Sequence, residues 1–447
     1  MSKIQPARGM RDFLPADIRK RNYVINIIRE VYESYGFEPL ETPAVENIET
    51  LTGKYGEEGN QLIFKILKRG EKLEQELGAG KITNENDLSD LALRYDLTVP
   101  LARVVAQHKN ELPKFFRRYQ IQPVWRADRP ARGRYREFYQ CDVDAIGSKS
   151  MMVEAELCAA GNKVLKRLGF NDFIIRVNHR AILYAMLDAV KIEEEKQTDA
   201  LVALDKLDKI GEESVLKEFE NRGIEKDAAS KLLNLFGNLK NLDNSKILTA
   251  LSEFIGQNKA GQEGIKQVSQ ILEMAGLESL KIDASLARGL SYYTGAIFEV
   301  NAPDLAGSIA SGGRYDDLIG MFGKEQIPAS GFSLGLERIL LIMDEREMFP
   351  PELETNPADV LVTVWNEDTA GESLKLASEL RRENLRVLVY PEADKLGKQF
   401  KYADSIGICY VCVLGETELA ENKVTLKNMR TGAQEIVARE NLAEKIK

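Results

Sequence analysis

Apolar residues recur at helical spacing over 15–35 and 151–168, and strand-like runs occupy 114–145 between these two predicted helices. From about 183 to 278, apolar residues recur every three or four positions with almost no strand signal, which predicts a helical insertion. Strand signal returns at 295–300 and is followed by another helix. Strands in groups with helices around them predict an α+β core on an antiparallel sheet.

A Pro-rich stretch at 349–357 separates this core from a last segment with a different pattern. Strand and helix signals alternate regularly over 360–414, which predicts a parallel or mixed α/β sheet. The sequence therefore predicts a core over 1–348, a linker over 349–357 and a separate α/β domain over 358–447.

The 447-residue chain has an ordinary globular composition, with 44% apolar and 29% charged residues. Its 61 basic and 70 acidic residues give a net charge of −9, which excludes a wholly basic nucleic-acid coat protein. A local basic site stays open, because a nucleic acid responds to the nearby field rather than to net charge.

The sequence lacks the residues that several kinds of site would need. The only two histidines, His108 and His179, lack ligand-spaced partners, so we expect neither a zinc cluster nor a Ser-His-Asp hydrolase. Gly80 and Lys81 are followed by Ile82, so no P-loop is available for ATP. We expect no protein-held metal.

The termini and cysteines predict a cellular compartment. The four cysteines form no disulfide framework, which is typical of a reducing compartment. The first ten residues lack an apolar signal region, and no apolar run approaches the ~20 residues of a membrane span. We therefore expect a cytoplasmic protein without a membrane segment.

The densest candidate chemistry is a basic stretch at 114–136. It holds eight basic residues and one acid, and five arginines fall between Arg126 and Arg136. Arginine favours planar, bidentate recognition of phosphate. Strand-like segments on both sides predict that this loop is the tip of an antiparallel hairpin.

Three more clusters combine glycines with charged or aromatic residues, at 286–299, 311–317 and 331–340. In the last of these, Glu337 and Arg338 fall in the first turn of a predicted helix. An acid there suits the helix dipole, whereas an arginine does not. Arg338 is therefore expected to have an anionic partner.

These segments resemble the class II aminoacyl-tRNA synthetases. Arg126 with 134–140 (Arg-Tyr-Arg-Glu-Phe-Tyr-Gln) is similar to motif 2 of the class, and 335–338 (Gly-Leu-Glu-Arg) to motif 3. Segment 35–43 (Tyr-Gly-Phe-Glu-Pro-Leu-Glu-Thr-Pro) resembles motif 1, which implies a homodimer interface.

Two further segments resemble signatures of the histidyl-tRNA synthetase family. They are 288–295 (Arg-Gly-Leu-Ser-Tyr-Tyr-Thr-Gly) and 311–316 (Ser-Gly-Gly-Arg-Tyr-Asp), and 93–98 fits the substrate loop of that family. Ser291 stands where the family usually has aspartate. The resemblance implies ligation of histidine to tRNA(His) through histidyl-adenylate, with ATP and Mg²⁺.

The resemblance also implies site residues. Arg126 and Arg288 would be catalytic, on two sides of the ATP α-phosphate. The remaining ATP-binding residues would be Arg136, Phe138, Glu337 and Arg338. Arg136 has an alternative as a strand arginine paired with Glu137 or Asp128.

Histidine selection needs a donor and an acceptor on opposite edges of the ring. Asp144 and Tyr293 match these family roles. Tyr292 is nearly as good a candidate as Tyr293, because adjacent strand residues face opposite ways and the sequence does not show which face is the pocket. The implied histidine contacts are Asp96, Leu97, Thr98, Arg126, Gln140, Asp144, Arg288, Tyr292 and Tyr293.

The C-terminal domain would read the anticodon. Segment 395–404 has three lysines and two aromatic residues, a combination that suits single-stranded RNA. Two alternatives stay open: an inactive regulatory subunit of histidine biosynthesis with the same fold, and a class II synthetase for glycine, threonine or proline. The anticodon-type domain and Arg126, Arg288 and Arg338 argue against the first, and 288–295 argues against the second.

Overall fold

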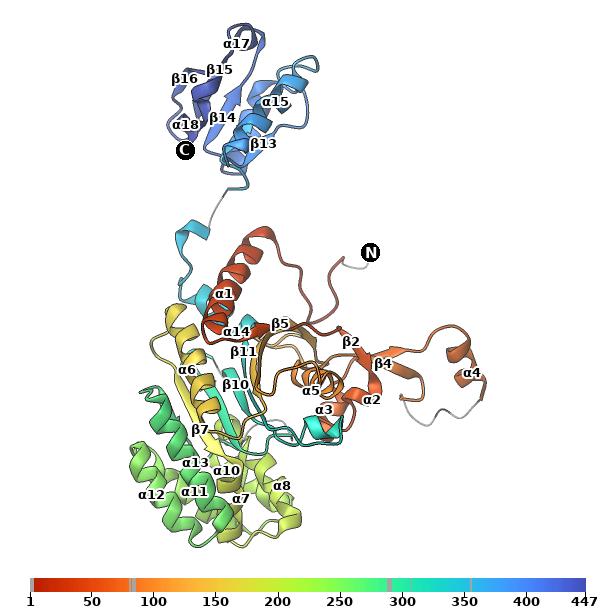
Figure 1. Cartoon of the computed structure of the whole chain (residues 1–447), viewed down its shortest axis with the longest axis vertical. Helices are drawn as coiled ribbons and strands as arrows, with labels where there is room; N and C mark the ends of the chain where they lie inside the picture. The colour runs from red at the N-terminus through yellow and green to blue at the C-terminus, as the bar shows by residue number, and fades with distance from the viewer. Residues whose placement is uncertain (1–3, 80–81, 83–85, 288–291, 306, 354–355) are drawn as a thin grey trace. The chain divides into compact units, whose positions relative to one another are not determined.

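The computed structural model describes residues 4–79, 82, 86–287, 292–305, 307–353 and 356–447 (Figure 1). The chain divides into two compact units, residues 1–349 and 350–447. Each unit has its own buried core, and each is described by itself below.

An eight-stranded sheet forms the centre of the first unit. Its order is β1-β5-β6-β11-β10-β9-β7-β8, and every pair is antiparallel except the parallel edge pairs β1–β5 and β7–β8. The predicted antiparallel sheet is confirmed. The strands are β1 Glu38–Pro39, β5 Phe116–Trp125, β6 Glu137–Ile146, β7 Ile174–His179, β8 Leu280–Ile282, β9 Ala296–Asn301, β10 Ser308–Arg314 and β11 Ala329–Gly335.

The two faces of this sheet differ because successive side chains on a strand point to opposite sides. One face is apolar and includes Cys141, Val143 and Ala145 of β6, which are buried. Four helices pack on it: α1 Pro15–Ser34, α6 Met152–Arg167, α13 Lys259–Ala275 and α14 Leu336–Glu345. Gly161 of α6 has no room for a side chain, because a Cβ there would lie 2.6 Å from the Phe332 ring of β11.

The opposite face carries polar residues in cross-strand rows. Arg118, Asp144 and Gly331 are aligned across β5, β6 and β11. In the next row, Asp142 of β6 lies opposite Ser333 of β11. Buried polar and charged groups cost free energy unless they are paired, so this face is a candidate for a functional site.

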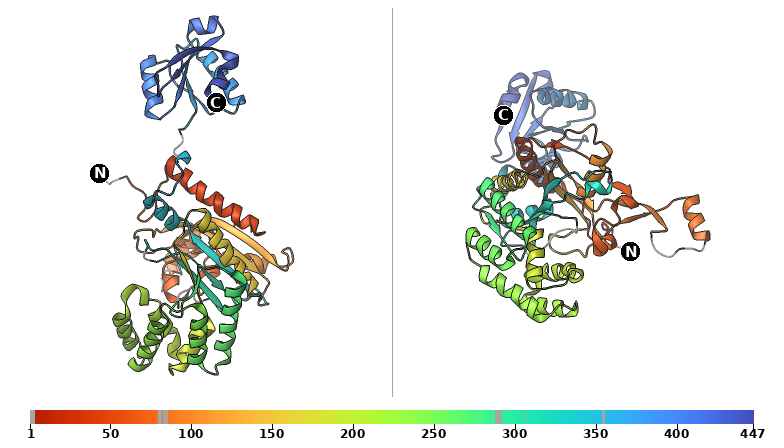
Figure 2. Two further views of the ribbon diagram at one scale, coloured as in Figure 1. Left: turned by 90° about the vertical axis from the view of Figure 1, so that its left-hand side faces the viewer. Right: turned by 60° about the horizontal axis from the view of Figure 1, so that its bottom comes forward.

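The predicted helical insertion is confirmed. Between the parallel strands β7 and β8, the described chain is helical and contains no strand, and Figures 1 and 2 show these helices gathered together in green. They are α7 Arg180–Ala189, α8 Glu194–Leu204, α9 Leu207–Ile210, α10 Glu212–Asn221, α11 Lys226–Leu239, α12 Asn244–Ile255 and α13.

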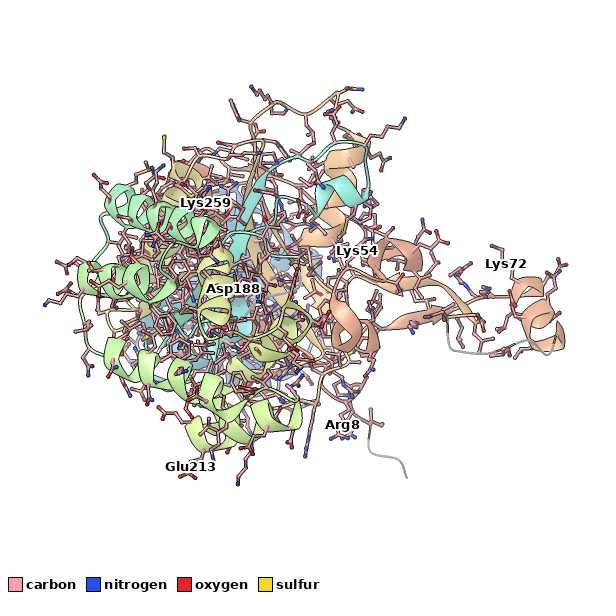
Figure 3. All side chains as sticks on the ribbon, turned by 90° about the horizontal axis from the view of Figure 1, so that it is seen from below. Arg8, Lys54, Lys72, Asp188, Glu213 and Lys259 are labelled. Carbon is pink, nitrogen blue, oxygen red and sulfur yellow. The ribbon has the colours of Figure 1, made fainter. Side chains whose placement is uncertain are left out.

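A smaller sheet, β2-β4-β3, stands out from the first unit as an arm with Lys72 near its tip (Figure 3). A second apolar cluster holds its base and α5 against the ends of β5 and β6. The elements here are β2 Val45–Asn47, α2 Ile48–Leu51, α3 Gly56–Gln61, β3 Lys65–Leu67, α4 Glu71–Ala79, β4 Ser89–Leu93 and α5 Thr98–Gln107.

The second unit contains a five-stranded sheet of order β13-β12-β14-β15-β16. The first three strands are parallel and the last two antiparallel, so the predicted mixed α/β sheet is confirmed. Its elements are β12 Val360–Val362, α15 Ala370–Arg382, β13 Val387–Val389, α16 Leu396–Ser405, β14 Tyr410–Val413, α17 Glu416–Ala420, β15 Lys423–Asn428, β16 Gln434–Ala438 and α18 Leu442–Ile446. No helix among the described residues of either unit could span a membrane.

Candidate active site on the polar face of the sheet

The arginine loop is the tip of the β5–β6 hairpin, as the sequence predicts. Arg126 leaves the end of β5, and its Nε donates to the carbonyl of Tyr95 at 3.0 Å. Its guanidinium carbon lies 4.3 Å from the ring centroid of Tyr95 and 5.2 Å from that of Phe138. Arg126 is therefore held between two aromatic rings beside the polar face.

The other arginines of the loop have different partners. Arg134 forms an ion pair with Asp128 at 2.8 Å, and Arg132 pairs with Glu345. Arg136 Nε donates to the carbonyl of Asp128 at 3.0 Å. The alternative that pairs the Arg136 guanidinium with a carboxylate is not what the structure shows, because its partner is a backbone oxygen.

Glu337 and Arg338 lie in the first turn of α14. The Glu337 carboxylate is buried, accepts from Arg21 Nη1 at 2.9 Å and accepts from the Tyr139 amide at 3.0 Å. Both of its oxygens thus have protein partners. Arg338 donates to the backbone carbonyl of Ser308 and, at 3.4 Å, to that of Gly133.

Asp96 lies in the loop before α5 and is 1% exposed. It accepts from the Tyr55 hydroxyl at 2.9 Å, the Val99 amide at 3.0 Å and the Tyr292 hydroxyl at 3.1 Å. Burial raises the pKa of this carboxyl. Leu97 is fully buried, and its carbonyl accepts from Arg118 Nη2 at 3.3 Å.

Asp144 is 2% exposed on β6. Its Oδ1 accepts from the Tyr315 hydroxyl. Its Oδ2 lies 2.9 Å from Arg118 Nη2 as an ion pair but accepts no aligned hydrogen bond from the described residues. Gly331 leaves room for this carboxylate, since a Cβ there would lie 2.0 Å from Oδ1. Oδ2 is therefore the less well satisfied oxygen of this carboxylate, and burial raises the pKa of Asp144.

Gln140 and Asp142 precede Asp144 on the same face of β6. Gln140 Nε2 donates to Ser333 Oγ at 3.2 Å and approaches Asp142 Oδ1 at 3.4 Å. Gln140 Oε1 is buried without a hydrogen-bond partner among the described residues. Burial is the largest of the effects that raise the pKa of Asp142 to about 7.

Sequence reasoning missed Asp142, Arg118 and Tyr315. The signal for Asp142 was present, because strand alternation places residues 140, 142 and 144 on one face. Arg118 is fully buried and Tyr315 is 1% exposed, and both act on the predicted residue Asp144.

Tyr292 and Tyr293 lie before β9 rather than on a strand. Their rings contact each other edge to face, with centroids 5.0 Å apart, so the expectation that strand alternation separates them is wrong. The Tyr292 hydroxyl donates to Asp96, whereas Tyr293 is partly exposed. Burial raises the pKa of Tyr293, and the nearby charges of Asp142 and Asp144 raise it further. Arg288 and Ser291 lie outside the described residues.

The face has two chemical sides. Three buried carboxylates, Asp96, Asp142 and Asp144, lie near one another, and Arg118 pairs with Asp144 and lies near Asp142. This group suits a small cationic ligand with ring N–H donors. Arg126 lies at the edge of this group and suits an anion. Among the described residues, no group of three or more His, Cys, Asp or Glu is placed to hold a metal ion.

In the second unit, the predicted lysine and aromatic segment forms α16. Gln399 is buried and binds both the amide and the carbonyl of Val364, at 3.0 and 2.8 Å. Tyr402 is 40% exposed and packs edge to face on Tyr390, and Lys398 pairs with Asp394. One side of α16 is therefore packed into the domain, and the exposed side carries an aromatic ring and lysines.

The chain is similar to known proteins along nearly its whole length. A family model described as histidyl-tRNA synthetase matches residues 9–339, and one described as an anticodon binding domain matches 359–447. A protein of Porphyromonas gingivalis (strain ATCC BAA-308 / W83) named histidine–tRNA ligase is 46% identical, over 98% of this chain and 97% of its own. One of Christiangramia forsetii with the same name is 44% identical, over 96% and 95%.

Two solved structures give the same picture of the fold. Histidyl-tRNA synthetase from Nostoc sp. PCC 7120 matches with a TM-score of 0.78 and 32% identity, over 100% of this chain and 99% of its own. A Bacillus halodurans structure described as an ATP phosphoribosyltransferase regulatory subunit/histidyl-tRNA synthetase has a TM-score of 0.72 over 92% of this chain and 99% of its own. At 21% identity, the second match shows the fold alone.

Proposed function

The chain belongs to the histidyl-tRNA synthetase family and is a histidine–tRNA ligase, and we propose that the polar face of its first unit activates histidine with ATP. The observation that carries this assignment is the match of ligases over almost the full length, including the anticodon-type domain. A regulatory subunit of histidine biosynthesis is not favoured, since the curated relatives are ligases along both units.

We assign the ATP phosphates to the arginine side of the site. Arg126 is stacked between two rings, so its guanidinium is oriented before the nucleotide arrives. Arg136, Arg288 and Arg338 would neutralise further phosphate oxygens, and Phe138 would stack on adenine. Glu337 supports this set by holding Arg21 and the backbone of β6. Magnesium would arrive with ATP.

We assign histidine to the acidic side. Asp144 Oδ2, which accepts no aligned hydrogen bond from the described residues, suits a ring N–H, and Tyr293 would meet the other ring nitrogen. Gln140 Oε1, Thr98 and the carboxylates of Asp96 and Asp142 would surround the α-ammonium group. Because an ammonium offers three donors, it can satisfy a buried amide oxygen and a carboxylate together.

The reaction joins these two sides. A histidine carboxylate oxygen attacks the α-phosphorus, the bond from this phosphorus to the β-bridging oxygen breaks, and pyrophosphate leaves. Arginines that are already oriented stabilise the charge that develops on the phosphoryl oxygens. In the second step, a hydroxyl of the tRNA 3′ nucleoside attacks the activated carbonyl carbon and its proton passes to solvent. The bond from this carbon to the phosphate oxygen breaks, and AMP leaves.

The second unit would bind the anticodon through α16, where Tyr402 offers a stacking surface and lysines face phosphates. We also propose a homodimer through the 35–43 region and a cytoplasmic location.

We expect only histidine to support exchange of pyrophosphate into ATP when all twenty amino acids are tested. The reason is the acidic side of the site, which offers a ring acceptor and an ammonium site together. Exchange supported by threonine or proline, or by no amino acid at all, would overturn the substrate assignment.

We expect Asp142→Asn to weaken histidine binding while it stabilises the fold at high pH. Asp142 faces Arg118, Asp144 and Asp96, so the group carries excess negative charge that the ammonium would balance. A hydrogen bond to a charged group contributes about 1.5–3 kcal/mol, so KM for histidine should rise roughly tenfold to a hundredfold.

The stability part follows from the sign of the pKa shift. Because the folded-state pKa of Asp142 is raised to about 7, the folded protein binds this proton more tightly than the unfolded chain. The carboxylate therefore costs stability as pH rises from about 4 to 7. The variant should melt higher than wild type at pH 8, and the gain should shrink at pH 5. A lower melting temperature with unchanged KM for histidine would show that Asp142 has only a structural role. The control is Asp227→Asn, because Asp227 is exposed and pairs only with Lys231 on the surface of α11 among the ion pairs described.

A further inference from the structure

The segment that precedes α1 lies against the arginine loop. The Arg136 amide donates to the carbonyl of Gly9 at 2.8 Å. Two residues on, the guanidinium carbon of Arg11 lies 3.4 Å from the ring centroid of Tyr135. Residues 9–13, called here the N-terminal strap, therefore contact the last residues of the loop by a backbone hydrogen bond and by a stacked cation.

Gly9 fits this contact only because it has no side chain. A Cβ at Gly9 would lie 2.9 Å from Cγ of Arg136 and 2.9 Å from Cγ of Pro130. The residue also has a φ of +85°, a conformation that L side chains rarely adopt. A side chain here would push the strap away from two points of the loop at once.

The strap also contacts α1. The guanidinium of Arg21, on α1, lies 4.1 Å from the ring centroid of Phe13 in the strap. Arg21 forms the buried ion pair with Glu337 of α14 at 2.9 Å. Glu337 also accepts from the Tyr139 amide of β6, so strap, helix and hairpin share one buried connection.

We infer that the N-terminal strap positions the arginine loop for ATP, and that Gly9 and Arg11 are positioning residues for nucleotide binding. The inference rests on the proposed role of this loop in binding the phosphates. A loop of 126–136 that was free to move would lose conformational freedom when ATP bound, and the strap removes that freedom beforehand. Among the described residues, the contacts of the strap given above are with the arginine loop and with Arg21, so its effect should fall on ATP and spare histidine.

The test uses Gly9→Ala in the full chain, with Gly223→Ala as the matched control. Gly223, between α10 and α11, has a φ of +69° and no atom within 4 Å of its ideal Cβ, so it reproduces the backbone strain without the collision. Arg11→Ala and Arg11→Lys separate the stacked guanidinium from its charge. KM for ATP and KM for histidine are measured by pyrophosphate exchange, and melting temperature reports on folding.

We expect Gly9→Ala to raise KM for ATP about tenfold or more, with KM for histidine within about twofold of wild type. Arg11→Ala should act in the same direction and Arg11→Lys should restore only part of the effect, while Gly223→Ala should behave as wild type. Unchanged kinetics in Gly9→Ala and Arg11→Ala would overturn the inference. Equal losses for both substrates, or losses that follow the melting temperature, would also overturn it, since the strap would then be only structural. Wild type in the same series tests the proposed function separately, because that function fails if wild type shows no histidine-dependent exchange.

Discussion

Replacement of Arg126 by alanine is expected to slow histidine-dependent pyrophosphate exchange roughly 100- to 1000-fold, the loss typical of one oriented charge-stabilising donor. The structure explains why so large a part of the rate should depend on one side chain. Arg126 is fixed by the carbonyl of Tyr95 and by the rings of Tyr95 and Phe138, so its charge needs no reorientation when the phosphoryl charge develops. The fall should appear in turnover more than in KM for ATP.

Arg167→Ala is the matched control for this experiment. Arg167 ends α6 and forms an exposed ion pair with Glu30, a type of contact that contributes little to stability. Its exchange rate should stay within about twofold of wild type. If Arg126→Ala retains turnover within about fivefold of wild type, Arg126 is a structural arginine and the phosphate assignment is wrong.

Removal of the second unit is expected to separate the two chemical steps. A chain that ends at Leu353 keeps the eight-stranded sheet and every described residue that we assign to ATP and histidine. It should therefore keep histidine-dependent exchange within about tenfold. Charging of tRNA should fall by about 100-fold or more, because base stacking contributes ~1–3 kcal/mol for each base held.

The salt dependence of tRNA binding provides the second measurement. Loss of lysine contacts to phosphates should reduce the slope of log affinity against log salt concentration. Circular dichroism and gel filtration confirm that the shortened chain is folded. Charging at the full-length rate would show that the second unit is not the RNA reader. A folded chain that cannot activate histidine would show that the second unit completes the active site.

Local pattern was enough to predict much of this protein. Strand alternation on β5 and β6 and the arginine loop between them are encoded in consecutive residues, so the hairpin follows from the sequence. The same is true of the helical insertion and of the alternating strands and helices after residue 358. The family resemblance also rests on short segments, and the matches over the full length bear it out.

Tertiary structure decided which side chains are partners. Strand alternation places Asp144 on the polar face. Only the folded structure shows that its carboxylate is bound by Arg118 of β5 and by the Tyr315 hydroxyl. The carboxylate of Glu337, which the family resemblance assigns to the ATP site, accepts from Arg21, 316 positions away in sequence.

The physical reason is that partners so distant in sequence are brought together by packing rather than by local preference. Burial then changes their chemistry, as in the raised pKa of Asp142, which no composition or spacing could give. The sequence by itself determined the elements and the residue types of the site. Only the folded arrangement decided which charges compensate one another and which acceptors remain for the substrate.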